Sequence, residues 1–257
     1  MTQPTSLVTF LLDKSQSMLT CKAATIEGFN AYLGVLKAER EANIEFTFLQ
    51  FDTVSIDKLA VAQPVASIAP LNDATYNPRG GTPLIDAAVT TIRAIEASLA
   101  LRSDKPKVVV CIQTDGEENS STQHTWEELR GLVRAKTEQG WQFNFLGAGI
   151  DAYDQGAKMG VSAMNTMSYD HTSKAATQSG FRESASNHAS FSAGRSADTS
   201  YSMAARASAG DMHAHRHFSD PSVSVAAIKP AALDLSTLGS KAAPVSPNAP
   251  AGLDLSH

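Results

Sequence analysis

An apolar segment near the start of the chain runs directly into side chains that carry oxygen. Residues 7–12 are almost continuously apolar, which is typical of a strand buried on both faces of a parallel sheet. Asp13 ends this predicted strand, and Ser15 and Ser17 follow it. Ligands of open α/β sheets bind at the carboxyl ends of strands, so these side chains stand where such a fold places its chemistry. They offer only hard oxygen atoms, which suit Mg²⁺, Mn²⁺ or Ca²⁺ better than zinc or copper.

Asp and Ser are also common in turns and at helix starts, so this segment alone leaves an ordinary structural role open. Two later segments favour the metal site. In residues 79–84 (RGGTPL) the glycines permit a tight loop, and Pro83 stands where a helix begins, which places Thr82 in a loop before that helix. The β-branched residues 107–114 predict another buried strand, and Asp115 follows it as Asp13 follows the first.

Apolar periodicity predicts the remaining elements of an α/β domain. Helical spacing is found at residues 21–37, 85–101, 126–137 and 152–159, and strand patterns at residues 44–51 and 142–146. Residues 56–61 predict a weaker strand that pairs antiparallel at the sheet edge. Strands that alternate with helices indicate βαβ crossovers. The predicted fold is therefore a doubly wound, Rossmann-like α/β domain with a mostly parallel sheet flanked by helices.

Composition narrows the class of protein and its partners. A formal charge of −5, without a basic stripe, argues against non-specific nucleic-acid binding. No apolar run reaches membrane-spanning length and no charged leader with an apolar core opens the chain, so we expect a cytoplasmic protein without a membrane segment. The two cysteines, Cys21 and Cys111, are expected to be buried, reduced thiols.

The C-terminal part of the chain differs from the rest in composition. Residues 182–190 predict a last helix, and residues 191–257 are rich in Ser, Ala and Pro, so we place the domain at 1–190 and a flexible tail at 191–257. The sequence LDLS occurs in this tail at residues 233–236 and again at 253–256. The two copies are either a bivalent peptide ligand or a chance recurrence in a biased segment.

Three histidines alternate along the predicted tail, at positions 213, 215 and 217. An extended chain would place all three on one side, with Asp211 near them, and imidazoles in that arrangement can bind Zn²⁺ or Ni²⁺. The surrounding Ser/Ala-rich sequence supplies no further ligand pattern, so an incidental solvated run is the other interpretation.

Taken together, Asp13, Ser15, Ser17, Thr82 and Asp115 resemble the metal-ion-dependent adhesion site of the von Willebrand factor A (vWA) family. Members carry an Asp-x-Ser-x-Ser motif after the first strand, a Thr in a second loop and an Asp in a third. The fourth motif position is often Gly in the family and is Gln16 here. Residues 25–30 (TIEGFN), 114–121 (TDGEENSS) and 141–152 (WQFNFLGAGIDA) make the chain most similar to small stand-alone intracellular vWA proteins of bacteria and phages.

The resemblance implies a function as well as a fold. In such a site the hydroxyls of Ser15, Ser17 and Thr82 would hold Mg²⁺, with Mn²⁺ or Ca²⁺ as alternatives, while Asp13 and Asp115 would act mainly through ordered water. A partner protein would then donate an Asp or Glu carboxylate to the ion. We therefore expect a protein-binding module that is not an enzyme.

Three alternatives remain. An Asp at a strand end beside Mg²⁺ also serves phosphoryl transfer, but in the Asp-nucleophile pattern the residue two positions later is an acid, and here it is Ser15. A nucleotide-binding domain would need a glycine-rich phosphate loop after the first strand, and neither G-x-G-x-x-G nor a P-loop is present there. The chain could also be a structural or assembly protein that uses its tail as a bivalent peptide ligand.

Overall fold

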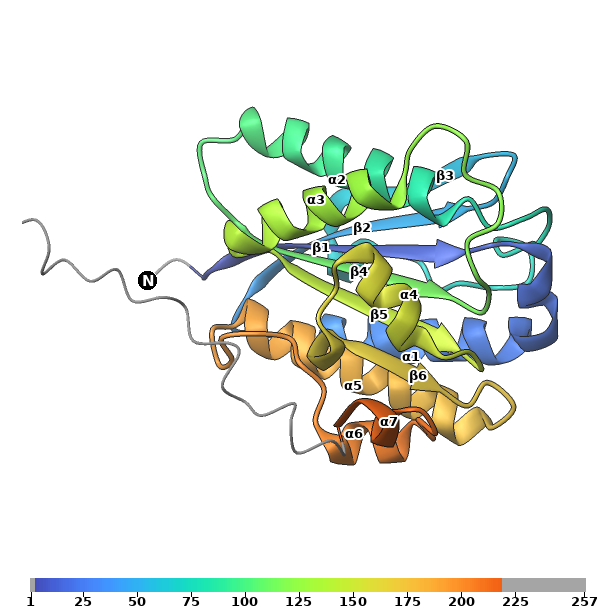
Figure 1. Cartoon of the computed structure of the whole chain (residues 1–257). Coiled ribbons are helices and arrows are strands. Elements are labelled where there is room, and N and C mark those ends of the chain that lie inside the picture. The colour runs from blue at the N-terminus through green and yellow to red at the C-terminus, as the bar shows by residue number, and fades with distance from the viewer. Residues whose placement is uncertain (1–2, 219–257) are drawn as a thin grey trace, which may run out of the picture. The chain divides into compact units, whose positions relative to one another are not determined.

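The computed structural model describes residues 3–218, which form a sheet of six strands with helices on both faces (Figure 1). The strands are β1 (Thr5–Asp13), β2 (Asn43–Phe51), β3 (Ile56–Pro64), β4 (Lys107–Thr114), β5 (Gln142–Ala148) and β6 (Thr166–Tyr169). Their order in the sheet is β3-β2-β1-β4-β5-β6, and every pair is parallel except β2–β3. The predicted mostly parallel α/β sheet with an antiparallel edge strand is confirmed.

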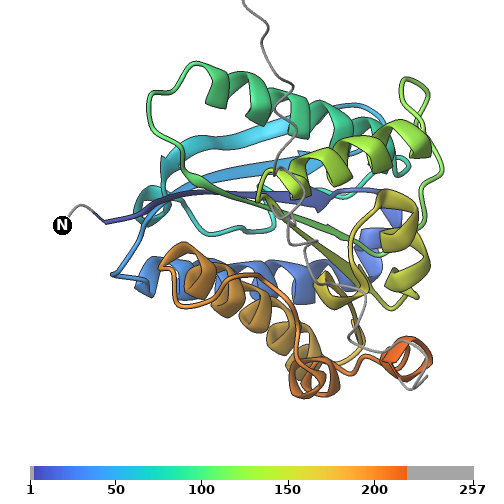
Figure 2. The same cartoon turned by 60° about the vertical axis from the view of Figure 1, so that its left-hand side comes forward.

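Seven α-helices and three short 3₁₀ segments complete the described chain. The α-helices are α1 (Lys22–Ala38), α2 (Leu84–Ala100), α3 (Trp126–Glu138), α4 (Ala152–Met159), α5 (Lys174–Ser192), α6 (Met203–Ser208) and α7 (Ala214–Phe218). The 3₁₀ segments are η1 (Gln16–Cys21), η2 (Val65–Ser67) and η3 (Ala163–Asn165). Helices α1 and α5 cover one face of the sheet, while α2, α3 and α4 cover the other (Figures 1 and 2).

The central strand β1 contributes side chains to the cores on both faces. Phe10 points toward α1 and α5, where its ring lies 5.4 Å from that of Phe29 and 6.0 Å from that of Phe181. Leu11 points the opposite way, into the core under α2 and α3. Because β1 is buried on both faces, its sequence is apolar without alternation, as the sequence analysis assumed.

The described domain extends past the boundary predicted after residue 190. Helix α5 begins at Lys174 and ends at Ser192, and the chain then packs on the domain through α6 and α7. Phe191 and Tyr201 are buried, so the predicted start of the tail at residue 191 is too early. The short strand β6, which the apolar pattern did not identify, pairs with β5 and forms the second edge of the sheet. The LDLS copies lie outside the described residues.

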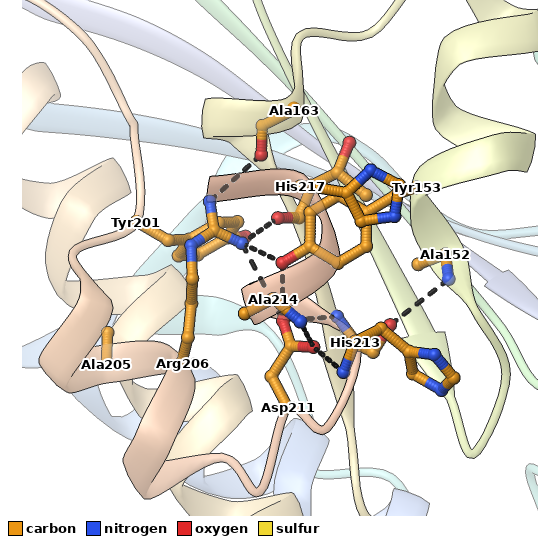
Figure 3. Close-up of polar contacts among 12 residues, drawn as sticks. Ala152, Tyr153, Ala163, Tyr201, Ala205, Arg206, Asp211, His213, Ala214 and His217 are labelled. Atoms are coloured by element: carbon orange, nitrogen blue, oxygen red, sulfur yellow. Dashed lines mark hydrogen bonds and ion pairs between the residues drawn. The ribbon is translucent and has the colours of Figure 1, made fainter. Parts of the chain in front are cut away.

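A buried polar cluster attaches α6 to the β6 edge (Figure 3). The guanidinium of Arg206 donates hydrogen bonds to the carbonyls of Thr166, Ala163 and Met164. Asp211 accepts hydrogen bonds from the hydroxyl of Tyr153 at 2.6 Å and from the backbone N–H of Ser168 at 3.1 Å. Since these donors and acceptors satisfy one another, the polar side chains can be buried here, and an apolar pattern does not predict this attachment.

The alternating histidines do not lie on an extended chain. His215 and His217 belong to helix α7, and His215 is exposed. His213 Nδ1 and His217 Nε2 lie 3.3 and 3.6 Å from the two carboxylate oxygens of Asp151. Among residues 3–218, no group of three or more His, Cys, Asp or Glu side chains is arranged to hold a metal ion. No helix within that range is long and apolar enough to cross a membrane.

Candidate metal site

The five residues proposed as metal ligands lie at the carboxyl edge of the sheet, toward which the arrowhead of β1 points (Figure 1). Asp13 is the last residue of β1, and Asp115 directly follows β4. Ser15 and Ser17 stand at the start of η1, and Thr82 lies two residues before α2. Because β1 and β4 are neighbours in the sheet, their ends bring the two carboxyl groups to the same place.

Asp13 is fully buried, and each of its three oxygen atoms accepts a hydrogen bond. Its Oδ1 accepts a hydrogen bond from the backbone N–H of Ser15 at 2.6 Å, and its Oδ2 accepts one from the hydroxyl of Thr114 at 2.6 Å. Its backbone carbonyl accepts a hydrogen bond from the hydroxyl of Tyr76 at 2.6 Å. Burial raises the pKa of Asp13 from 3.8 to about 6, because its charged form loses solvation.

The two motif serines form a chain of hydroxyls that leads to the second carboxyl group. Ser15 Oγ lies 3.0 Å from Ser17 Oγ, and Ser17 Oγ donates a hydrogen bond to Asp115 Oδ1 at 2.7 Å. Burial raises the pKa of Asp115 as well, although this hydrogen bond acts in the opposite direction. A continuous series of hydrogen bonds therefore connects Asp13, through Ser15 and Ser17, to Asp115 on the neighbouring loop.

Thr82 reaches the same place from a third loop. It is buried, and its backbone N–H donates to Asn119 Oδ1 at 2.9 Å while its carbonyl accepts from the Asn119 N–H at 3.2 Å. A Cβ atom placed on Gly116 would lie 3.5 Å from Thr82 Oγ1 and 3.6 Å from Ser17 Oγ. The two hydroxyls therefore face the space beside Gly116, which the absent side chain leaves open.

The chemistry of this cluster fits a divalent cation of the hard class. Its five members supply two carboxyl groups and three hydroxyl groups, with no nitrogen or sulfur donor. Burial disfavours the charged form of both carboxyl groups, and a bound cation would reverse that preference. Lys14, although it lies inside the motif, does not supply this charge, because its ammonium pairs with Asp52 and Asp57 instead.

Several residues that position the site were not identified from the sequence. Thr114 immediately precedes Asp115, so its place at a strand end was visible, but its hydrogen bond to Asp13 depends on the pairing of β4 with β1. Tyr76 lies in a loop whose path no local pattern predicts. Arg79 was noted only as part of its loop, yet its Nε donates to Asp52 Oδ2 at 2.8 Å beside the motif.

Comparison with known proteins finds similarity in structure only. No protein-family model and no curated protein matches the sequence. Proximal thread matrix protein 1 from the mussel byssus is similar with a TM-score of 0.54 at 12% identity, over 74% of this chain and 47% of that one. The von Willebrand factor type A structure from Catenulispora acidiphila has a TM-score of 0.50 at 15% identity, over 72% and 42%.

The vWF domain of the type V pili tip protein Mfa5 from Porphyromonas gingivalis is also similar, and the match covers nearly all of that domain. Its TM-score is 0.53 at 9% identity, over 73% of this chain and 96% of the Mfa5 domain. The chain has the vWA fold. It spans about half the length of the mussel protein, and identities this low establish the fold alone. The narrower similarity of this vWA domain to bacterial and phage stand-alone proteins stays a prediction.

Proposed function

We propose that this vWA domain is a metal-dependent protein-binding module. The observation that carries the proposal is the cluster of Asp13, Ser15, Ser17, Thr82 and Asp115, in which a buried and a half-buried carboxyl group and three hydroxyls from three loops share one edge of the sheet. Mfa5, whose vWF domain is similar in structure at 9% identity, is a pili tip protein.

In this proposal the chain's own residues hold and orient the ion. Ser15, Ser17 and Thr82 provide neutral oxygens, and Asp13 and Asp115 provide the negative charge that balances it. The loaded Mg²⁺, or Mn²⁺ or Ca²⁺ in its place, supplies a positive centre with an open position. A partner protein completes the coordination with an Asp or Glu carboxylate.

The hydrogen bonds of Asp13 favour binding over phosphoryl transfer. A nucleophilic aspartate needs a carboxylate oxygen that can reach a phosphorus atom. In this domain Asp13 is fully buried, and its two carboxylate oxygens already accept hydrogen bonds from Ser15 and Thr114. The group is therefore held as a structural anion rather than presented to a substrate.

Thermal unfolding with and without metal tests the site. At Mg²⁺ concentrations about a hundredfold above Kd, binding to the folded state adds about 2.7 kcal/mol, which for a domain of this size raises Tm by roughly 5 to 10 °C. Ser15→Ala and Thr82→Ala should each remove most of this rise. Ser98→Ala, at an exposed position on α2, serves as the control. An equal rise in all four proteins would show that the ion binds elsewhere.

Capture of partners distinguishes binding from catalysis. The immobilised full chain should retain specific proteins in Mg²⁺ and release them in chelator, and Thr82→Ala should retain none of them. A metal-dependent hydrolysis of p-nitrophenyl phosphate that disappears with Asp13→Asn would instead support the phosphoryl-transfer alternative.

A further inference from the structure

Arg79 presents one anchored edge and one free edge of its guanidinium beside the candidate metal site. Its Nε donates a hydrogen bond to Asp52 Oδ2 at 2.8 Å. Within the described part of the chain, the two terminal nitrogens of Arg79 have no hydrogen-bond acceptor, and 54% of the side chain is exposed. A guanidinium carries five N–H donors in a planar fork, so most of its hydrogen-bonding capacity faces solvent.

The anchored edge is rigid because its acceptor is rigid. Asp52 is buried and accepts hydrogen bonds from the backbone N–H groups of Val54 at 2.6 Å and Ser55 at 2.9 Å. Its Oδ2 also lies 3.2 Å from the ammonium of Lys14. The backbone N–H of Arg79 donates to the carbonyl of Lys14 at 2.8 Å, so both ends of the Arg79 side chain are fixed. A side chain held in this way loses little conformational entropy when it binds a ligand.

The position of Arg79 relates it directly to the metal ligands. It lies three residues before Thr82, and the carbonyl of Gly80 accepts a hydrogen bond from the Gln16 N–H at 3.0 Å. Asp52, which accepts the hydrogen bond of Arg79, directly follows β2. Strand β2 pairs with β1 on the side opposite β4. Neighbouring strands lie about 4.8 Å apart, so the ends of β2 and β4 are separated by about 10 Å.

The described loops that surround the site are residues 14–21, 52–55, 71–83 and 115–123. Arg79 is the one exposed arginine or lysine in these loops. Lys14 is buried and paired with Asp52. Lys22, at the start of α1, pairs with Asp73 at 3.2 Å. In these described loops, a partner therefore meets one exposed guanidinium whose terminal N–H groups are unpaired, in a protein whose formal net charge is −5.

We propose that Arg79 is a second anchor for the partner, which binds through two carboxylates. One carboxylate completes the metal site, and the other forms a bidentate pair with the free edge of the Arg79 guanidinium. An extended peptide rises about 3.3 Å per residue, so two acidic residues three positions apart span about 10 Å, the separation of the ends of β2 and β4. The inference rests on the proposed function and adds the partner's chemistry, a pair of acidic residues.

Peptide titrations of the full chain in Mg²⁺, followed by ¹H–¹⁵N chemical shifts, test this anchor. The probes are acetyl-Asp-Gly-Gly-Asp-amide and the two peptides in which either Asp is replaced by Asn. We expect about tenfold tighter binding of the diacid, because its second carboxylate forms a bidentate, charge-assisted pair with the partly exposed Arg79 guanidinium. The net negative charge of the protein acts against this preference, so a positive result is specific.

Variants separate the anchor from a merely structural role. Arg79→Gln should reduce the diacid to the affinity of the monoacids, while the Mg²⁺-induced rise in Tm changes little. Arg79→Lys keeps the charge without the fork and should restore only part of the preference. Arg134→Gln removes an arginine that is 80% exposed on α3, and it should leave the preference unchanged.

Each contrary result has a distinct meaning. Equal affinity of diacid and monoacids for the wild-type protein would overturn the second anchor and leave the proposed function intact. If Arg79→Gln weakens Mg²⁺ and all three peptides by the same factor, Arg79 acts only through the loop of Thr82, and the inference is wrong. Binding that persists in chelator, or no binding at millimolar peptide, would contradict the proposed function itself.

Discussion

Asp13 combines a place in the candidate metal site with a fully buried carboxyl group, so its charge affects folding as well as binding. Burial raises its pKa from 3.8 to about 6. Between these values the folded protein holds a proton that the unfolded chain releases, so the stability of the metal-free protein falls as pH rises through this window. Above it, the buried charge costs up to about 3 kcal/mol.

Asp13→Asn should therefore stabilise the metal-free protein at pH 7.5 by roughly 1 to 3 kcal/mol. The amide oxygen can still accept from Ser15, and the amide nitrogen can donate to Thr114, whose hydroxyl also lies 3.1 Å from the carbonyl of Gly116. Urea unfolding in chelator measures the gain. In Mg²⁺ the order should reverse, because the variant lacks a charge that the ion needs.

Asp73→Asn provides the control for this prediction, since Asp73 is a surface carboxylate with an 89% exposed side chain. Its removal should change stability by less than 1 kcal/mol in either condition, as expected for an exposed pair. A destabilised Asp13→Asn variant in chelator would show that the carboxylate is favourable even without metal.

Site residues that directly follow a strand could be placed at the carboxyl edge of the sheet from the sequence, because the strands themselves could be predicted. Asp13 and Asp115 follow long apolar runs, so their common edge could be derived from strand alternation alone. Thr114, Tyr76 and Arg79 could not be assigned roles, because each acts through a hydrogen bond to a residue at least 27 positions away. Tertiary contacts of this kind leave no trace in local periodicity.

At the scale of elements, the buried histidine of α5 connects three parts of the domain. His188 Nδ1 lies 2.7 Å from the hydroxyl of Tyr32 on α1, and its Nε2 lies 3.1 Å from Asn144 Oδ1 on β5. The amide oxygen accepts, so the imidazole is neutral with its proton on Nε2 and accepts from Tyr32 at Nδ1. Burial lowers the pKa of His188 from 6.5 to about 3.

This histidine should make the domain sensitive to acid. Below pH 6.5 this histidine is protonated in the unfolded chain but stays neutral in the folded protein until about pH 3. The free energy of unfolding therefore decreases as the pH is lowered from 6.5 to 3. The slope from one such group reaches about 1.4 kcal/mol per pH unit. His188→Gln keeps one donor and one acceptor but does not titrate, so its unfolding free energy should fall less steeply between pH 6.5 and 4.5.

His215→Gln, at an exposed position on α7, should retain the wild-type slope in the same denaturant titrations. Parallel slopes for His188→Gln and wild type would mean that His188 is protonated in the folded protein.

Most elements agreed with the sequence analysis, but the long helix α5 was predicted only over residues 182–190, and the short elements β6 and α6 were not predicted. Helices α1, α2 and α3 have apolar faces that repeat over several turns, so their periodicity was clear. Strand β6 has four residues and α6 has six, which is too short for a period to show. Their burial rests on polar contacts such as those of Arg206, which apolar patterns do not record.

At the scale of the whole molecule, the position of the C-terminal end of the domain determines how far the chain can be shortened without loss of stability. The sequence placed it after residue 190, whereas residues 191–218 contribute Phe191, Tyr201 and Arg206 to the buried interior. Fully burying one large apolar side chain contributes about 1.5 to 3 kcal/mol, so removal of this segment should cost several kcal/mol.

A chain that ends at Phe218 should therefore keep the Mg²⁺-dependent rise in Tm, while one that ends at Ser190 should unfold at much lower urea concentration or fail to fold. Circular dichroism during urea titration compares the two. Equal stability of both chains would restore the boundary at residue 190 and would contradict the packing of α6 on the domain.

Sheets template further growth only where an edge offers unpaired backbone groups to another chain. At the β6 edge, Arg206 already occupies the carbonyl of Thr166, and Asp211 occupies the N–H of Ser168. At the β3 edge, the irregular register near Ala62, whose φ is +45°, bends the strand before it ends at Pro64. We therefore expect both margins of the sheet to be poor templates for strand addition, so that folded copies of this domain should pair edge to edge less readily than copies with regular, unpaired edge strands.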